Sequence, residues 1–122
     1  MINQEEHRIQ CAIVDYLVNL ENLGLLTFFA IINGVYAHGK TPVARGKAVN
    51  KLKREGMRPG VPDIQIIAND QVFFLETKTK TGVFTPSQKI MIPKFKKFGV
   101  DTYIVRSIAD VEKTLKARNI LK

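Results

Sequence analysis

The sequence has few of the residues on which several common kinds of protein site depend. It contains one cysteine, Cys11, which excludes an internal disulfide framework and a zinc site built from several cysteines. It contains two histidines and no tryptophan, and without further cysteines two histidines are too few to indicate a zinc centre. No apolar run reaches the roughly 18 residues that a membrane-spanning helix needs. We therefore expect no membrane partner.

The N-terminal residues also lack the pattern of a secretory signal. The first ten residues, MINQEEHRIQ, contain acids where a signal peptide would carry a positive charge followed by an apolar core. We therefore expect an intracellular, cytoplasmic protein. The 122 residues, 45% of them apolar and 25% charged, are enough for one soluble domain spanning 1–122. This composition excludes a wholly disordered chain and a coiled-coil rod.

Acidic residues are scarce relative to basic ones, and the excess of positive charge is concentrated in two blocks. The chain has 19 Lys and Arg against 11 Asp and Glu, a formal net charge of +8. Residues 40–58 contain seven basic side chains and one acid, and residues 77–100 contain six lysines and no acid. Two such blocks favour a polyanionic partner, most often nucleic acid, although a solvated basic face is the simpler alternative.

Periodicity and turn signals indicate alternating helices and strands. Apolar residues recur at helical spacing in 3–22, and 43–55 is compatible with a basic helix. Thr85 begins a capping-box sequence that predicts a helix to about Phe98, with a kink or break at Pro93. Ser107 should cap a last helix. We expect a buried strand at 25–32, a hairpin of 63–68 with 71–78, and a strand at 101–106.

The hairpin register brings two carboxylates together. A two-residue turn at Asn69-Asp70 pairs Ala68 with Gln71, and counting back along the strands sets Asp63 opposite Glu76. Directly opposed side chains share a face, and like charges set there destabilise a sheet unless a cation offsets them. Oxygen ligands in that arrangement suit Mg²⁺ or Mn²⁺.

Lys78 lies two residues beyond Glu76, on the same face of the strand. Its ammonium group could orient a water or stabilise charge on a phosphate beside the metal. The alternative is a purely structural role, in which Asp63 caps a turn while Glu76 and Lys78 form an exposed ion pair. We favour the metal site, because an Asp after a Gly-Val-Pro turn and opposite Glu-x-Lys is an uncommon combination.

Two further residues have both a structural and a functional interpretation. Glu6 lies on the apolar stripe of the first helix, so it either interacts with the helix dipole or reaches the metal site, and beside the other two carboxylates we favour the metal site. Gln88 either completes the capping box with Thr85 or points its amide into the site. The sequence leaves these two alternatives for Gln88 open.

These motifs together resemble the VRR-NUC domain (virus-type replication–repair nuclease), a branch of the PD-(D/E)xK nuclease superfamily. The resemblance covers nearly the whole chain and rests on four segments, namely Glu6-His7-Arg8-Ile9-Gln10, Gly60-Val61-Pro62-Asp63, Glu76-Thr77-Lys78 and Thr85-Pro86-Ser87-Gln88. It implies an α/β fold with a restriction-endonuclease-like αβββαβ core, a mixed sheet flanked by helices. It also implies metal ligation by Asp63, Glu76, the carbonyl of Thr77 and Glu6, with Lys78 as the catalytic lysine and Gln88 in support.

The resemblance further implies the activity and its partners. The family implies metal-dependent hydrolysis of phosphodiester bonds in DNA, and its stand-alone members resemble Holliday-junction resolvases and tend to form homodimers; the oxygen ligands of this chain point to Mg²⁺ or Mn²⁺ as the metal. We therefore expect a DNA-repair endonuclease, in a bacterial or phage-like context, acting on DNA that is branched. A DNA-binding module without catalysis is the alternative. The basic residues that we expect to contact phosphates are Lys40, Arg45, Lys47, Lys51, Lys53, Arg54, Lys80 and Lys89.

A competing motif lies between the first strand and the basic segment. Residues 34–41, GVYAHGKT, match the phosphate-binding pattern G-x-x-x-x-G-K-[ST] of P-loop nucleotide hydrolases. Pro42 follows directly, where the helix of a P-loop should donate N–H groups to phosphate. The hairpin would also make the supposed second strand of such a fold antiparallel. We prefer a basic, glycine-rich loop that follows the DNA backbone.

Overall fold

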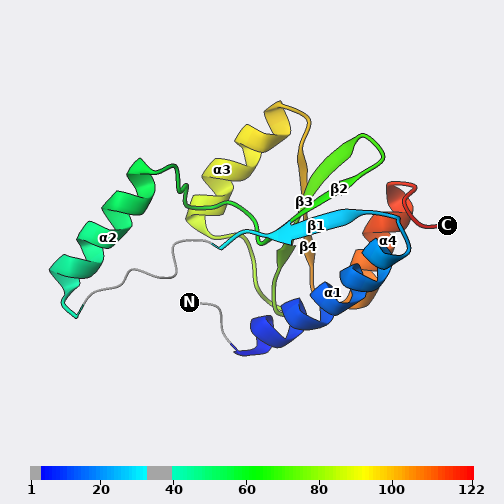
Figure 1. Ribbon diagram of the computed structural model, residues 1–122, viewed down its shortest axis with the longest axis horizontal. Coiled ribbons are helices and arrows are strands. Elements are labelled where there is room, and N and C mark those ends of the chain that lie inside the picture. Colours follow the sequence, from blue (N-terminus) through cyan, green and yellow to red (C-terminus); the bar gives the residue numbers. More distant parts are fainter. Residues whose placement is uncertain (1–3, 33–39) are drawn as a thin grey trace.

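A mixed β-sheet with helices on both faces organises the fold (Figure 1). The computed structural model describes residues 4–32 and 40–122, which contain four helices and four strands in the order α1-β1-α2-β2-β3-α3-β4-α4. The helices are α1 (Gln4–Asn22), α2 (Pro42–Arg54), α3 (Pro86–Lys97) and α4 (Ile108–Ala117). The strands are β1 (Thr27–Ala30), β2 (Ile64–Ala68), β3 (Gln71–Thr77) and β4 (Asp101–Val105). The expected α/β fold with a mixed, helix-flanked sheet is confirmed.

The strands lie in the order β1-β2-β3-β4. The pairs β1–β2 and β2–β3 are antiparallel, and the pair β3–β4 is parallel. The predicted hairpin register is confirmed, because Ala68 pairs with Gln71. Asn69 and Asp70 have φ angles of 44° and 64°, the left-handed backbone that a two-residue hairpin turn requires. The parallel pair is reached by crossing over through α3, as parallel strands require.

Side chains alternate between the two faces of the sheet and are covered by different helices. On one face, α1 and α4 pack against the central strands, and the core there comprises residues such as Ile13, Leu17, Ile66, Phe73, Leu75, Val111 and Leu115. On the other face, α3 packs with Met91 buried and with the ring of Phe95 centred 4.9 Å from that of Phe74. Residues that alternate with the core positions of β3 therefore face α3.

One local expectation is wrong, and a second is wrong in part. The segment 25–32 is not a buried strand, because β1 spans only Thr27–Ala30, lies at the sheet edge and leaves Phe29 48% exposed. Of the kink or break expected at Pro93, the break is wrong, because α3 continues to Lys97. Pro93 is exposed, so its ring and the missing hydrogen bond lie on the solvent side, where a helix accommodates them most easily.

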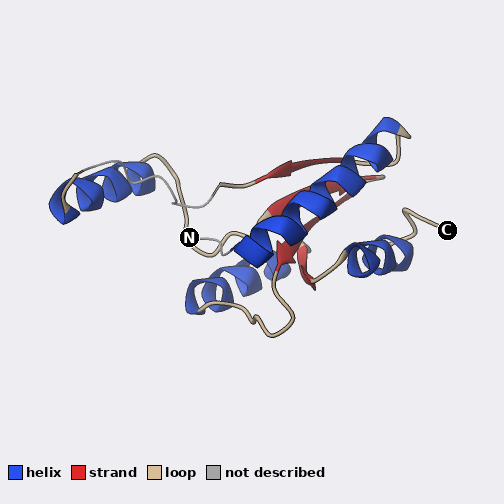
Figure 2. Ribbon diagram, turned by 90° about the horizontal axis from the view of Figure 1, so that it is seen from below, coloured by secondary structure: helices blue, strands red, loops and turns tan. Residues whose placement is uncertain are grey.

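Helix α2 stands apart from the rest of the molecule, as two views at right angles agree (Figure 1 and Figure 2). The Thr41 hydroxyl accepts a hydrogen bond from the Ala44 N–H and caps its start, which confirms that 43–55 is helical. None of its residues is buried. Among the described residues, no helix is both long enough and apolar enough to cross a membrane.

Candidate active site

Asp63 and Glu76 meet where β2 begins and β3 ends. The ladder pairs Ile64 with Leu75, and one step further along the same register Asp63 faces Glu76. The Asp63 backbone N–H donates to Glu76 Oε1 at 3.0 Å, and the Thr77 N–H donates to Asp63 Oδ2 at 2.9 Å. Each carboxylate is thus held by the backbone of the opposite strand, and the predicted juxtaposition is confirmed.

Glu76 is the centre of a buried polar cluster. Lys78 Nζ lies 3.1 Å from Glu76 Oε2, and Gln88 Nε2 donates to the same oxygen at 2.6 Å. The exposed fractions are only 4% for Glu76 and 7% each for Lys78 and Gln88. The alternative of an exposed ion pair is therefore wrong. Charged groups at this depth are rare unless they are paired, and these are paired by hydrogen-bonded contacts.

Gln88 fills both of the roles that the sequence left as alternatives. Its backbone N–H donates to the Thr85 hydroxyl at 3.2 Å, and its side-chain oxygen accepts from the Thr85 N–H at 2.9 Å. These reciprocal bonds are the capping box of α3. Because the oxygen serves the cap, the amide nitrogen is directed to Glu76. The cap therefore fixes the side chain that orients the carboxylate.

The surroundings of Asp63 disfavour its charged form and raise its pKa. Burial, and after it the negative charge of Glu76, raises the pKa of Asp63 from its ordinary 3.8 to about 7. The hydrogen bond from the Thr77 N–H and the positive charge of Lys78 act in the opposite direction, while the charge of Glu6 adds a further upward push. Two neighbouring carboxylates with one lysine leave an excess of negative charge.

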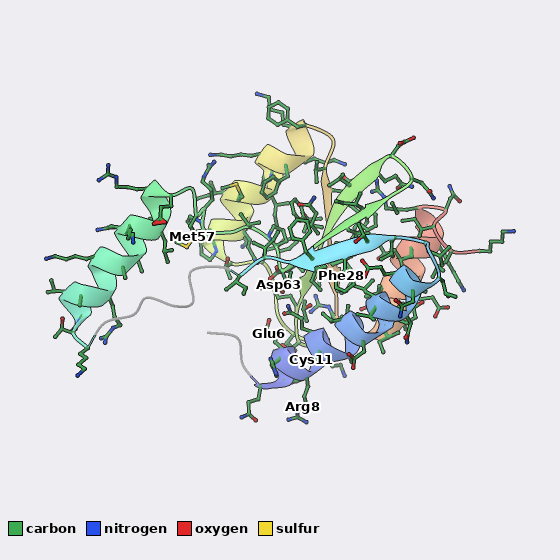
Figure 3. The ribbon with its side chains drawn as sticks, in the orientation of Figure 1. Glu6, Arg8, Cys11, Phe28, Met57 and Asp63 are labelled. Carbon is green, nitrogen blue, oxygen red and sulfur yellow. The ribbon has the colours of Figure 1, made fainter. Side chains whose placement is uncertain are left out.

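A cleft of about 830 Å³ opens onto this cluster, and Asp63, Glu76, Lys78 and Gln88 all line it. Glu6, in the first turn of α1, lines the same cleft, and Figure 3 shows it near Asp63 in that view. Met57 and Arg58, from the loop after α2, line the cleft as well. Arg58 belongs to the basic block 40–58, but the sequence did not indicate that it lines the cleft, and Met57 was missed; their nearness to the Pro59-Gly60 turn is the signal that could have placed them there.

The oxygen ligands of the site are of the kind that a hard divalent cation prefers, but they are too few to complete its coordination. Asp63 and Glu76 offer carboxylate oxygens beside excess negative charge, which is what Mg²⁺ and Mn²⁺ prefer. Within the described residues, no three His, Cys, Asp or Glu side chains are grouped closely enough to hold a metal ion together. Glu6 shares the cleft without joining such a group. A cation here would keep several water ligands, as Mg²⁺ commonly does.

The predicted phosphate-contacting side chains are all exposed and lie in two places. Six belong to α2 or its N-terminal approach, and Lys80 and Lys89 lie near the cluster, after Lys78 and in the first turn of α3. The competing motif at 34–41 falls mostly outside the described residues. Its described end argues against a phosphate loop, because the Thr41 hydroxyl is engaged in capping α2 and β3 is antiparallel to β2.

The fold is shared with known proteins, although the sequence is distant from them. No protein-family model matches the chain, and no curated protein is detectably similar to it. A solved structure described as "VRR_NUC domain" is 22% identical, with a TM-score of 0.61 over 93% of this chain and 97% of the other. A second, described as "VRR_NUC domain protein", is 18% identical, with a TM-score of 0.60 over 96% and 89%. The chain therefore has the fold of VRR_NUC domain proteins over nearly its whole length.

Proposed function

We propose that this protein is a Mg²⁺- or Mn²⁺-dependent DNA endonuclease that hydrolyses phosphodiester bonds. The observation that carries the proposal is the buried cluster in which Asp63 and Glu76 oppose each other while Lys78 and Gln88 contact Glu76. Likeness to the VRR_NUC domain fold supports it, because the name of that fold refers to nucleases. The cluster lies in an open cleft, so a polymer could reach it from solvent.

Asp63 and Glu76 would hold the cation, with the carbonyl of Thr77 as a further ligand. Glu6, which in the described residues does not group with them closely enough to bind directly, would act through a water ligand of the cation. A bound divalent cation would supply charge neutralisation at the phosphate and a lowered pKa for an attacking water. Lys78 would donate from Nζ to a non-bridging phosphate oxygen and stabilise the charge that develops there. Gln88, fixed by its capping box, would keep Glu76 in the orientation that binding requires.

The excess of positive charge would bind the substrate without reading its sequence. Exposed lysines and arginines on α2, together with Lys80 and Lys89, would contact phosphates, so affinity should fall steeply with salt. We further propose that the DNA is branched, as in a Holliday junction, and that two copies act together as a homodimer. A symmetric pair of cuts needs two active sites, which two-fold symmetry supplies.

The test is cleavage of a labelled four-way junction beside a linear duplex of matching sequence. Wild type, D63A and D70N are each incubated with Mg²⁺, Mn²⁺ or a chelator. D70N is the matched control, because Asp70 lies in the hairpin turn at the opposite end of β3 and Asn adopts the same backbone. We expect metal-dependent cutting by wild type and D70N, no cutting by D63A, and faster cutting of the junction than of the duplex.

Other outcomes would support a different function. If wild type binds both DNAs equally well with metal or chelator and cuts neither, the protein is a DNA-binding module without catalysis. Turnover of ATP that is abolished by K40A but not by K78A would instead support a nucleotide hydrolase. Equal cutting of junction and duplex would leave the nuclease in place and remove the preference for branched DNA.

A further inference from the structure

Arg106 reaches from the end of β4 to the turn that follows Lys78. Its Nη1 donates to the carbonyl oxygen of Thr79 at 2.5 Å and to that of Gly82 at 2.8 Å. The Gly82 N–H also donates to the Thr79 carbonyl at 3.0 Å, so residues 79–82 form a closed turn. One guanidinium group thereby ties both ends of this turn to the sheet.

The closed turn packs directly on the side chain of Lys78. A Cβ atom built on Gly82 would lie 3.3 Å from both Cβ and Cδ of Lys78, so the Gly82 backbone covers the aliphatic part of that side chain. The backbone of Lys78 is held too, because its N–H donates to the Val105 carbonyl at 3.2 Å. Lys78 is 7% exposed as a result, although Lys80 in the same turn is exposed.

Arg106 is itself fixed at its backbone. Its N–H donates to Asp110 Oδ2 at 2.8 Å, and Ser107 caps α4 by accepting from the Asp110 N–H at 3.2 Å. The start of α4 therefore sets where the Arg106 side chain begins. A lysine side chain has four rotatable bonds and loses its position easily unless its stem is packed, so this support matters for the ammonium group at its end.

We propose that Arg106 is a positioning residue that holds Lys78 against Glu76 by clamping residues 79–82 over its stem. The inference rests on the proposed nuclease function only for its effect on catalysis. The contacts predict that Lys78 becomes accessible when the clamp is removed, whatever the protein does. Arg106 itself is not required to touch DNA or metal.

The first measurement is acylation of lysines in the metal-free protein by N-hydroxysuccinimidyl acetate, followed by peptide mass spectrometry. The rate at Lys78 is divided by the rate at Lys80, the exposed internal reference. Wild type, R106A, R106K and R118A are compared. R118A is the matched control, because Arg118 is also a partly buried arginine with several hydrogen bonds, but its partners are Gln71, Asp101 and Tyr103.

We expect R106A to raise the acylation ratio at Lys78 by about tenfold or more, since local opening exposes a protected group. R106K should fall between R106A and wild type, and R118A should leave the ratio unchanged. In single-turnover cleavage we expect R106A to lower the rate by about 10- to 100-fold, the cost of a misplaced catalytic group, with DNA affinity within about twofold of wild type.

The proposal is overturned if R106A leaves the Lys78 ratio within about twofold of wild type, or if R118A raises it equally. Faster acylation with an unchanged cleavage rate overturns it as well. If circular dichroism shows that R106A does not fold, the acylation ratios of G82A and R106K are used instead. G82A keeps Arg106 but adds a methyl group against the Lys78 stem. An unchanged Lys78 ratio in both variants rejects the clamp. If wild type cuts no DNA, the proposed function fails, and acylation alone still decides the positioning role.

Discussion

The two opposed carboxylates of the site have unequal surroundings. Glu76 accepts hydrogen bonds from the Asp63 N–H and from Gln88 and is paired with Lys78. The side chain of Asp63 accepts one from the Thr77 N–H, and its pKa is raised to about 7. The repulsion between the two carboxylates therefore destabilises mainly the charged form of Asp63. A cation would act there most strongly, because it offsets the charge that is least stabilised.

This imbalance predicts how stability depends on pH. The folded-state pKa of Asp63 lies above its ordinary 3.8, so the stability that it contributes is complete below about pH 4 and is lost as the pH rises through 7. D63N keeps an acceptor for the Thr77 N–H but does not titrate. In metal-free buffer we expect D63N to gain on wild type between pH 4 and 7 and to stay about 2 kcal/mol ahead above that, after a discount for partial exposure.

Urea unfolding of both proteins at several pH values measures the difference. A difference in unfolding free energy between D63N and wild type that stays constant from pH 4 to 9 would show that the charge on Asp63 does not destabilise the fold. Added Mg²⁺ at pH 8 should stabilise wild type more than D63N, since D63N lacks the charged ligand. D70N serves again as the control and should follow wild type throughout.

At the scale of elements, much of the fold could be predicted because its signals are local. The Asn69-Asp70 turn sets the register of β2 and β3, and the register alone brings Asp63 to Glu76. Thr85 and Ser107 mark the starts of α3 and α4. Turn residues and caps act over a few positions, so the sequence reveals them directly.

What could not be predicted depends on tertiary neighbours. The apolar run at 25–32 is typical of a buried strand, and only the sheet order shows that β1 lies at an edge. Pro93 predicts a kinked or broken helix, and only the structure shows that α3 continues past it, with Pro93 exposed while Met91 and Phe95 pack on the sheet. In the site, the clamp from Arg106 spans 24 to 27 residues of sequence, and no local pattern signals it.

The approach of the loop before β2 to the start of α3 yields a prediction for Gly60. A Cβ atom there would lie 2.3 Å from the Ser87 carbonyl oxygen, and the φ angle is +89°. Gly99 has a similar φ of +84° with nothing within 4 Å of its Cβ position. G99A should therefore cost about 1 kcal/mol of backbone strain, and G60A about 3 kcal/mol or more, because the loop must also move away from α3.

Chemical denaturation measures the unfolding free energy of both variants. Both lose stability through backbone strain, but only G60A also loses it through steric overlap with Ser87, so their difference reports the overlap. Because Asp63 and Gln88 flank this contact on its two sides, G60A should also slow DNA cleavage while G99A should not. Equal losses of unfolding free energy in G60A and G99A would mean that the close approach is relaxed at little cost.

At the scale of the whole molecule, part of the positive charge lies on α2, away from the sheet and the helices that cover it. The sheet and its covering helices contain the core, whereas α2 projects from one end without a buried residue (Figure 1). On this helix Lys47, Lys51 and Arg54 fall within about 60° of one another, at 100° per residue. Because none of its residues is buried, this 13-residue helix gains little from packing within the described part of the chain and would be marginal in water by itself, so an anionic partner would also stabilise it.

If α2 holds phosphates, its basic stripe sets part of the salt dependence of DNA binding. The triple variant K47Q/K51Q/R54Q should bind duplex DNA more weakly. The slope of log K against log salt should shrink by about 0.9 for each phosphate that is no longer neutralised, so by up to about 2.7. Because none of these side chains is buried, the unfolding free energy should change little.

The matched control is K113Q/K116Q/K122Q, which removes the same charge from α4 and the C-terminus, at the opposite end of the molecule (Figure 1). Fluorescence anisotropy over a salt series measures both slopes. If net charge alone drives binding, the two triple variants should reduce the slope equally, and α2 would have no special role. A reduction confined to K47Q/K51Q/R54Q would place the duplex against α2, so that DNA bound there is directed along the cleft toward Asp63, because the loop that follows α2 lines that cleft through Met57 and Arg58.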